Sequence, residues 1–187
     1  MSIFLNNVND ITGHLVSAFL KEGGTAADMT MGNGHDTLKL LEATGEGGNV
    51  YAFDVQEKAL ENTRNLLGER KNVILIRDSH ENVDRYITEE LDLAVYNLGY
   101  LPGAEKDTKT EAESTTASLR KVLKLIKTGG HVIISVYTGH EGGMEEYEAI
   151  LDFLLKLNKK KYNALKLSYP NRKDTAPKMM IIEKISR

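Results

Sequence analysis

Two closely spaced glycines and a carboxylate that follows them are the residues of this chain best suited to chemistry. Gly32 and Gly34 lie within Asp28-Met-Thr-Met-Gly-Asn-Gly-His-Asp-Thr37, and Asp54 follows further along the chain. Glycines at this spacing let a strand turn sharply into a helix and let a ligand approach the backbone, and a carboxylate about 20 residues later can hold a ribose. The pattern predicts a site for a cofactor that contains a nucleoside.

The glycine pair does not identify the ligand by itself, because an ordinary tight turn also uses glycine. Further polar residues follow other short apolar segments, namely Asp78-Ser79-His80, Asn97 and Tyr137-Thr-Gly-His140. Ligands of parallel sheets bind beyond the carboxyl ends of the strands. Polar residues after each of five predicted strands therefore favour a functional site over a chance turn.

The hydrophobic spacing predicts alternating strands and helices. Strands are expected at residues 25–27, 50–53, 73–76, 91–96 and 131–137, with a closing antiparallel pair at 164–169 and 179–185. Helices are expected at 37–43, 57–67, 83–87, 119–126 and 144–157, after a first helix with Ile11, Leu15 and Phe19 on one stripe. Residues 99–114 are predicted to form a long loop, and Gly129-Gly130 to end the helix before the fifth strand.

Strands that alternate with helices indicate a parallel sheet, because parallel neighbours need crossover connections. We therefore predict one Rossmann-like α/β domain over residues 1–187. Its sheet is expected to be mostly parallel and seven-stranded, with a C-terminal antiparallel hairpin and helices on both faces. The polar residues named above are expected at the carboxyl ends of the parallel strands.

The composition excludes several kinds of chemistry. The chain of 187 residues contains no cysteine, which excludes disulfides, cysteine-ligated zinc, iron–sulfur clusters and a thiolate nucleophile. Pyrimidine C5 methylation through a cysteine adduct is excluded for the same reason, and we expect no metal. No apolar run approaches the ~20 residues of a membrane span, and Met1 to Asp10 does not form a signal peptide, so a cytoplasmic protein is expected.

Charge is distributed unevenly along the chain. The formal net charge is -3, yet the segment from Leu151 onward holds ten Lys or Arg against three Asp or Glu. A solvated surface is one explanation of runs such as Lys159-Lys160-Lys161. A phosphate-binding surface is the other.

S-adenosylmethionine (SAM) fits the glycine turn better than other nucleoside cofactors do. NAD sites need a third glycine, where this chain has Thr37, and a second nucleotide-binding half. A P-loop for ATP requires Gly-x-x-x-x-Gly-Lys-Ser/Thr, which does not occur. In a SAM site, Asp28 could lie near the ammonium group, Asp54 could accept both ribose hydroxyls, and Asp78-Ser79-His80 could meet the adenine. Asp36, Thr37 and His80 could instead cap helices.

The segment after the fourth predicted strand, Asn97-Leu-Gly-Tyr100-Leu-Pro102, resembles the Asn-Pro-Pro-Tyr type motif of amino methyltransferases. In that motif the asparagine carbonyl and a backbone carbonyl accept hydrogen bonds from the target amine, and the aromatic ring stacks on the base. Such acceptors hold the nitrogen lone pair in line with the methyl group, so that catalysis consists mainly of positioning.

Together these motifs resemble the small class I methyltransferases of the rRNA methylase type, including the MnmM (YtqB-like) family that methylates the 5-aminomethyl group of the tRNA wobble uridine. The segments that carry the resemblance also include His14, Tyr51-x-Phe53-Asp54-Val55-Gln56, Asp78-Ser79-His80-Glu81-Asn82, Tyr137-Thr138-Gly139-His140-Glu141-Gly142-Gly143, Pro177 and Glu183-Lys184. The chain departs from the family at Ser79, where glycine is frequent, and at Thr110-Glu111-Ala112, where Thr-Lys-Pro is frequent.

The resemblance implies SAM as methyl donor and RNA as substrate, most specifically the anticodon stem-loop of tRNA. We expect the cofactor to be bound by Asp28, Gly32, Asn33, Gly34, Asp36, Thr37, Asp54, Gln56, Asp78, Ser79 and His80. Asn97, Tyr100 and His140 are the expected catalytic residues, with His140 or Asp78 as possible proton acceptors. Lys159, Lys160, Lys161, Arg172 and Lys173 are expected to contact RNA phosphates, and a homodimer is one arrangement that would present two such surfaces.

Three alternatives stay open from the sequence. The same cofactor platform could methylate ribosomal RNA or a small-molecule amine. A non-catalytic RNA-binding module could also keep this fold.

Overall fold

Short apolar strands and amphipathic helices alternate along the chain, as the sequence predicts. The computed structural model describes residues 5–99 and 112–186. The strands are β1 (Thr25–Asp28), β2 (Asn49–Asp54), β3 (Val73–Arg77), β4 (Leu91–Leu98), β5 (Ile126–Val136), β6 (Tyr162–Leu167) and β7 (Lys178–Lys184). The helices are α1 (Val8–Phe19), α2 (His35–Thr44), α3 (Glu57–Leu67), the 3₁₀ helix η1 (His80–Arg85), α4 (Ala112–Leu125) and α5 (Gly143–Leu155).

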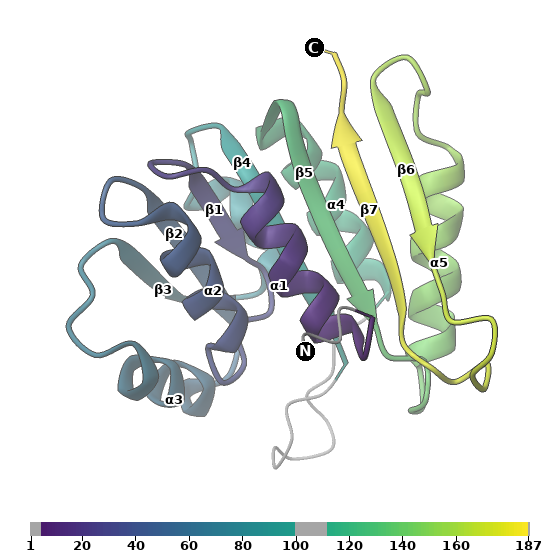
Figure 1. Ribbon diagram of the computed structural model, residues 1–187, viewed down its shortest axis with the longest axis horizontal. Coiled ribbons are helices and arrows are strands. Elements are labelled where there is room, and N and C mark those ends of the chain that lie inside the picture. Colours follow the sequence, from purple (N-terminus) through teal and green to yellow (C-terminus); the bar gives the residue numbers. More distant parts are fainter. Residues whose placement is uncertain (1–4, 100–111, 187) are drawn as a thin grey trace.

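The strands form one sheet in the order β3-β2-β1-β4-β5-β7-β6 (Figure 1). β1 to β5 run parallel to one another, whereas β7 is antiparallel to both β5 and β6. This arrangement confirms the predicted seven-stranded, mostly parallel α/β sheet with a C-terminal antiparallel hairpin. The order reverses next to β1, which is the place where sheets of this kind bind ligands.

Helices cover both faces of the sheet, and the alternation of side chains along β4 shows the two layers. Leu93 and Val95 pack with the apolar side chains of α1 and α2, whereas Ala94 and Tyr96 pack with those of α4 and α5. In Figure 1, α1, α2 and α3 lie in front of the sheet and α4 and α5 lie behind it. Because both faces are covered, β4 is apolar along most of its length, as expected for a central parallel strand.

Several predicted boundaries were wrong. The last residues of the predicted loop 99–114 are helical, because α4 begins at Ala112, and residues 100–111 of that loop lie outside the described residues. β5 begins at Ile126 and passes through Gly129 and Gly130, which were expected to lie between a helix and a strand. Its pairing with β4 shifts register before His131, and Gly129 has φ +84° there. These glycines therefore belong to an irregularity within the strand.

The direction of the C-terminal hairpin decides where the basic residues lie. Lys159, Lys160 and Lys161 precede β6, at the edge where the parallel strands begin (Figure 1). Arg172 and Lys173 follow β6, at the edge where the parallel strands end. A strand the length of β7 spans about 20 Å. The structure therefore separates the two basic clusters.

Among the described residues, no helix is both long and apolar enough to cross a membrane.

Candidate active site

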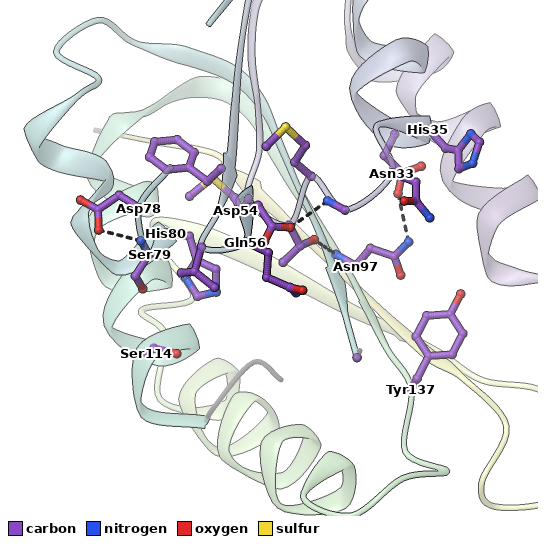
Figure 2. Close-up of a pocket in the computed structure, with 18 of the residues that line it drawn as sticks. Asn33, His35, Asp54, Gln56, Asp78, Ser79, His80, Asn97, Ser114 and Tyr137 are labelled. Atoms are coloured by element: carbon purple, nitrogen blue, oxygen red, sulfur yellow. Dashed lines mark hydrogen bonds between the residues drawn. The ribbon is translucent and has the colours of Figure 1, made fainter. Parts of the chain in front are cut away.

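A cavity of about 460 Å³ opens at the carboxyl ends of β1 to β4. Figure 2 shows Asp78, Ser79 and His80 at one end, Asp54 and Gln56 in the middle, and Asn33, Asn97 and Tyr137 toward the other end. The lining residues are Asn9, Met29, Thr30, Met31, Gly32, Asn33, His35, Asp36, Phe53, Asp54, Val55, Gln56, Asp78, Ser79, His80, Asn97, Gly99, Ser114 and Tyr137. This volume lies in the range of small-molecule and cofactor sites.

The glycine turn brings bare backbone to the cavity. Gly32 and Gly34 have φ of +53° and +82°, a backbone conformation that side chains rarely adopt. A Cβ on Gly34 would also lie 2.8 Å from Thr63 Oγ1. Gly34 is the N-cap of α2 and supplies no side-chain cap, so the first N–H groups of α2 are available to a polar ligand group.

Asp28 lies behind the turn and is fully buried. Its carboxylate accepts the Thr37 hydroxyl at 2.6 Å and the Thr30 N–H at 3.1 Å. Burial, together with the nearby charges of Asp36 and Asp54, raises its pKa from 3.8 to about 7. Asp28 therefore shapes the turn and its electrostatics, and neither Asp28 nor Thr37 lines the cavity.

Asp54 projects into the middle of the cavity with both oxygens already oriented. Oδ2 accepts the Gly32 N–H and Oδ1 accepts the Gln56 N–H, each at 2.9 Å. Burial raises the pKa of Asp54, and these backbone bonds oppose the shift. Because each carboxylate oxygen has two acceptor sites, one remains on each oxygen for a ligand hydroxyl.

The Asp78-Ser79-His80 turn closes the end of the cavity that lies away from Asn97 and Tyr137. Burial raises the pKa of Asp78, but hydrogen bonds from Asn82, Tyr86 and the Ser79 N–H outweigh it and hold the pKa below 3.8. Ser79, rather than His80, caps η1. Asp78 is therefore an ionised, hydrogen-bonded anchor of this turn.

His80 is a neutral side chain at the cavity. Burial lowers its pKa from 6.5 to about 4. The ring packs edge-on against Tyr96, and no described residue gives its buried Nδ1 atom a hydrogen-bond partner. Buried polar atoms are normally satisfied, so this Nδ1 is suited to a polar atom of a ligand ring.

Asn97 lies near the end of β4, and one hydrogen bond fixes its backbone while another fixes its side-chain amide. Its backbone N–H donates to Thr30 Oγ1 at 2.7 Å, and its side-chain Nδ2 donates to Asp36 Oδ2 at 3.1 Å (Figure 2). Lys39 Nζ donates to the other oxygen of Asp36 at 2.7 Å. Asp36 therefore contacts Asn97 and does not act as a helix cap.

Residues far apart in the sequence complete the end of the cavity around Asn97. Tyr137 lies directly after β5, and its hydroxyl donates to Asn9 Oδ1 of α1 at 3.1 Å. The Tyr137 ring also faces Gly99, where an added Cβ would lie 3.6 Å from it. The sequence pattern drew attention to the polar segment that contains Tyr137, but no local signal identified Asn9.

The structure groups most of the predicted site residues and separates others. The predicted residues that line the cavity are Gly32, Asn33, Asp36, Asp54, Gln56, Asp78, Ser79, His80 and Asn97. Gly34 lies behind this lining, like Asp28 and Thr37. His140 follows β5 outside the lining, and its Nδ1 lies 3.0 Å from the Glu141 carbonyl oxygen. Tyr100 falls outside the described residues.

The two predicted RNA-binding clusters lie at different distances from the cavity. Arg172 stacks over the Tyr169 ring at 3.9 Å and donates to the Asn6 carbonyl, next to the start of α1. It therefore lies on the same edge of the sheet as the cavity. Lys159, Lys160 and Lys161 are exposed at the opposite edge.

Residues 50–183 match the protein family described as "Putative rRNA methylase". The chain is also 36% identical over 147 residues to the Arabidopsis thaliana protein named tRNA (mnm(5)s(2)U34)-methyltransferase, chloroplastic. That alignment covers 72% of this chain and 54% of the relative. The chain thus spans about half the length of this curated relative.

Solved structures share the fold over nearly the whole chain. A structure from Clostridium thermocellum, described as a "putative rRNA-methylase", has a TM-score of 0.94 and 36% identity and covers 99% of this chain and 100% of its own. A "putative methyltransferase" from Streptococcus mutans in complex with SAH has a TM-score of 0.88 and 36% identity, with coverages of 96% and 99%. The chain therefore belongs to this rRNA methylase family of SAM-dependent class I methyltransferases.

Proposed function

We propose that the protein methylates the 5-aminomethyl group of uridine or 2-thiouridine at the wobble position of tRNA. The observation that carries this proposal is the fixed amide of Asn97, whose Nδ2 donates to Asp36 so that Oδ1 is left as an acceptor for an amine N–H. The name of the Arabidopsis relative supports the same substrate. A primary amine offers both the N–H for this contact and a lone pair for the methyl group.

The residues of the cavity fit SAM. The two remaining acceptor sites of Asp54 match the two ribose hydroxyls, and the Nδ1 atom of His80 matches a polar edge such as that of adenine. The Asp54 carboxylate lies beside the glycine turn, where its charge suits a cation. When bound, SAM supplies a methyl group on a positively charged sulfur.

The acceptor end holds the amine for in-line attack. Asn97 Oδ1 accepts one N–H, which directs the nitrogen lone pair away from Asn97. The carbonyl of the neighbouring Leu98 already accepts the Tyr137 N–H at 3.1 Å, so it has one acceptor site left. Positioning of this kind lowers the barrier without a nucleophile on the protein.

Only the neutral amine can attack, so a proton must leave the substrate. Asp78 lies at the far end of the cavity from Asn97, and its lowered pKa makes it a weak base. His140 lies outside the lining. We therefore propose that water carries the proton away and that desolvation of the bound substrate disfavours the charged amine.

Arg172 and Lys173 are the proposed contacts to the RNA backbone. Both are exposed on the edge of the sheet that holds the cavity. Phosphate contacts at this rim would orient the anticodon loop, whose bases are already splayed out. Lys159, Lys160 and Lys161 lie at the opposite edge of the sheet, so we do not assign them to the same loop.

Mass spectrometry of nucleosides from bulk tRNA tests the proposal. A strain that lacks the gene should accumulate 5-aminomethyl-2-thiouridine or its oxygen analogue, and purified protein with SAM should methylate that tRNA in vitro. Unchanged wobble nucleosides, together with altered methylation of ribosomal RNA, would replace tRNA by rRNA as the substrate. Transfer to a free small-molecule amine with no dependence on salt would indicate a small-molecule enzyme.

A further inference from the structure

We propose that Asp36 is a positioning residue that locks the side-chain amide of Asn97 in one orientation. This inference rests on the proposed function and deepens it. A carboxylate can only accept hydrogen bonds, so the group that Asn97 turns toward Asp36 must be its NH2 group. Oδ1 is then directed to the cavity, and the substrate atom next to it must be a donor.

The backbone of Asn97 is fixed independently of this contact. Its N–H donates to Thr30 Oγ1 at 2.7 Å, and it pairs with Ser135 in the parallel register of β4 and β5. The remaining freedom is rotation of the side chain. Because the two ends of an amide have nearly the same shape, only a polar partner can choose between them.

Asp36 is itself held without any ligand. It is 7% exposed in the first turn of α2, where the helix dipole favours a negative charge. Lys39 binds Oδ1 at 2.7 Å, and Asn97 binds Oδ2. Each oxygen thus already has a donor from a side chain of the protein, whereas the oxygens of Asp54 in the same cavity accept only from backbone N–H groups.

Asp36 and Asn97 together therefore discriminate between donor and acceptor groups of the substrate. With Oδ1 facing the cavity, an amine N–H gains a hydrogen bond, whereas a carbonyl or an unprotonated ring nitrogen meets another acceptor. A site that leaves such groups unpaired discriminates strongly against them. The specificity for an amine would then reside in Asp36 as well as in Asn97.

The substitution Asp36→Asn should invert the amide of Asn97 rather than merely loosen it. In the D36N protein, Lys39 would hold the new amide oxygen at position 36, so the new NH2 group would face Asn97. Asn97 would then turn its Oδ1 to that group and its own NH2 to the cavity. We expect kcat of D36N for tRNA at saturating SAM to fall roughly 10²-fold, with KM for tRNA and Kd for SAM changed little.

A second substitution should reverse this loss. In the double variant D36N/N97D, residue 97 again presents an acceptor oxygen to the cavity while its other oxygen accepts from residue 36. Activity should recover to within about tenfold of the wild type. The single variant N97D should stay poor, because it places two carboxylates against each other.

Three results would overturn the inference. One is a large rise in Kd for SAM with an unchanged kcat, which would make Asp36 a cofactor ligand. Another is a decrease in kcat on Asp36→Asn that is as large in the Asn97→Ala protein as in the wild type. Asp36 would then act independently of Asn97. The third is failure of D36N/N97D to recover while the protein remains folded by circular dichroism.

The matched control is Asp10→Asn. Asp10 lies in the first turn of α1 and accepts the Asn7 amide at 2.8 Å, so it forms the same kind of pair outside the cavity. This variant should leave kcat unchanged. A comparable loss in it would attribute the effect of Asp36→Asn to helix-terminal charge.

An NMR arm separates this inference from the proposed function. The NMR signal of the Asn97 side-chain NH2 group is assigned by its absence in N97A. In the free protein these protons should exchange slowly with water. Asp36→Asn should change both the chemical shift of this signal and its exchange rate. If that coupling appears and wild-type protein does not methylate tRNA, the substrate assignment fails and the positioning role stands. If tRNA is methylated and the coupling is absent, the positioning role fails alone.

Discussion

Replacing Asp54 by alanine should weaken SAM binding by two orders of magnitude or more. The carboxylate holds the N–H groups of Gly32 and Gln56 at 2.9 Å and keeps one acceptor site on each oxygen. Two ribose hydroxyls can fill these sites. Hydrogen bonds to a charged group contribute about 1.5–3 kcal/mol each, so losing both corresponds to about 3–6 kcal/mol, or roughly 10²–10⁴ in Kd.

Isothermal titration with SAM and with S-adenosylhomocysteine measures this loss. The two ligands share the ribose, so Asp54→Ala should weaken both by a similar factor. Glu89→Ala is a suitable control, because it removes a carboxylate that contacts Tyr51 and Thr25 away from the cavity. Its Kd should equal that of the wild type.

Deoxy analogues distinguish ribose binding from damage to the turn. In the wild type, removing the 2′- or the 3′-hydroxyl of S-adenosylhomocysteine should cost about 1.5–3 kcal/mol. In Asp54→Ala the same removal should cost almost nothing, because the acceptor has gone. An equal cost in both proteins would refute the assignment of Asp54 to the ribose, whatever the affinity of the variant for SAM.

Three further outcomes are expected. Asn97→Ala should lower kcat roughly 10²-fold and leave the Kd of SAM within about threefold, and an unchanged kcat would remove Asn97 from the mechanism. Asp28 has a folded pKa of about 7 against 3.8, so the folded state keeps a proton that the unfolded state loses, and stability falls as pH rises through that window. The free energy of unfolding of Asp28→Asn, measured by thermal unfolding, should therefore exceed that of the wild type by an amount that grows from pH 4 to pH 7, up to a few kcal/mol. A difference that does not depend on pH would contradict the burial argument. Joint replacement of Arg172 and Lys173 by alanine should make the plot of log K for tRNA binding against log[salt] less steep, by the equivalent of about one to two phosphate contacts. Lys160→Ala should leave this slope unchanged. Fluorescence anisotropy at several salt concentrations measures both slopes.

The sequence predicted the fold well because the strands are short, apolar and regularly separated by amphipathic helices. It failed at Gly129 and Gly130, which interrupt the pairing within β5 instead of preceding it. A glycine pair after a helix is normally a stop signal. Here the register shift against β4 is a tertiary feature, and local spacing carries no information about it.

The cofactor end of the site was predictable for a physical reason. Asp54 and the turn at Gly32 each follow directly from a strand, and parallel strands bring their carboxyl ends to one edge. Knowing the strands therefore placed these residues together. Asp28 and Thr37 hydrogen-bond to each other and do not line the cavity, which their position in the sequence did not indicate.

The acceptor end depends on contacts that no local motif encodes. Asn97 and Asp36 are 61 residues apart, and Tyr137 and Asn9 are 128 residues apart. The sequence identified Asn97 as a candidate site amide, but an amide presents a donor or an acceptor according to its partner. Choosing between amine and carbonyl substrates therefore requires the tertiary structure, and we propose that Asp36 makes that choice.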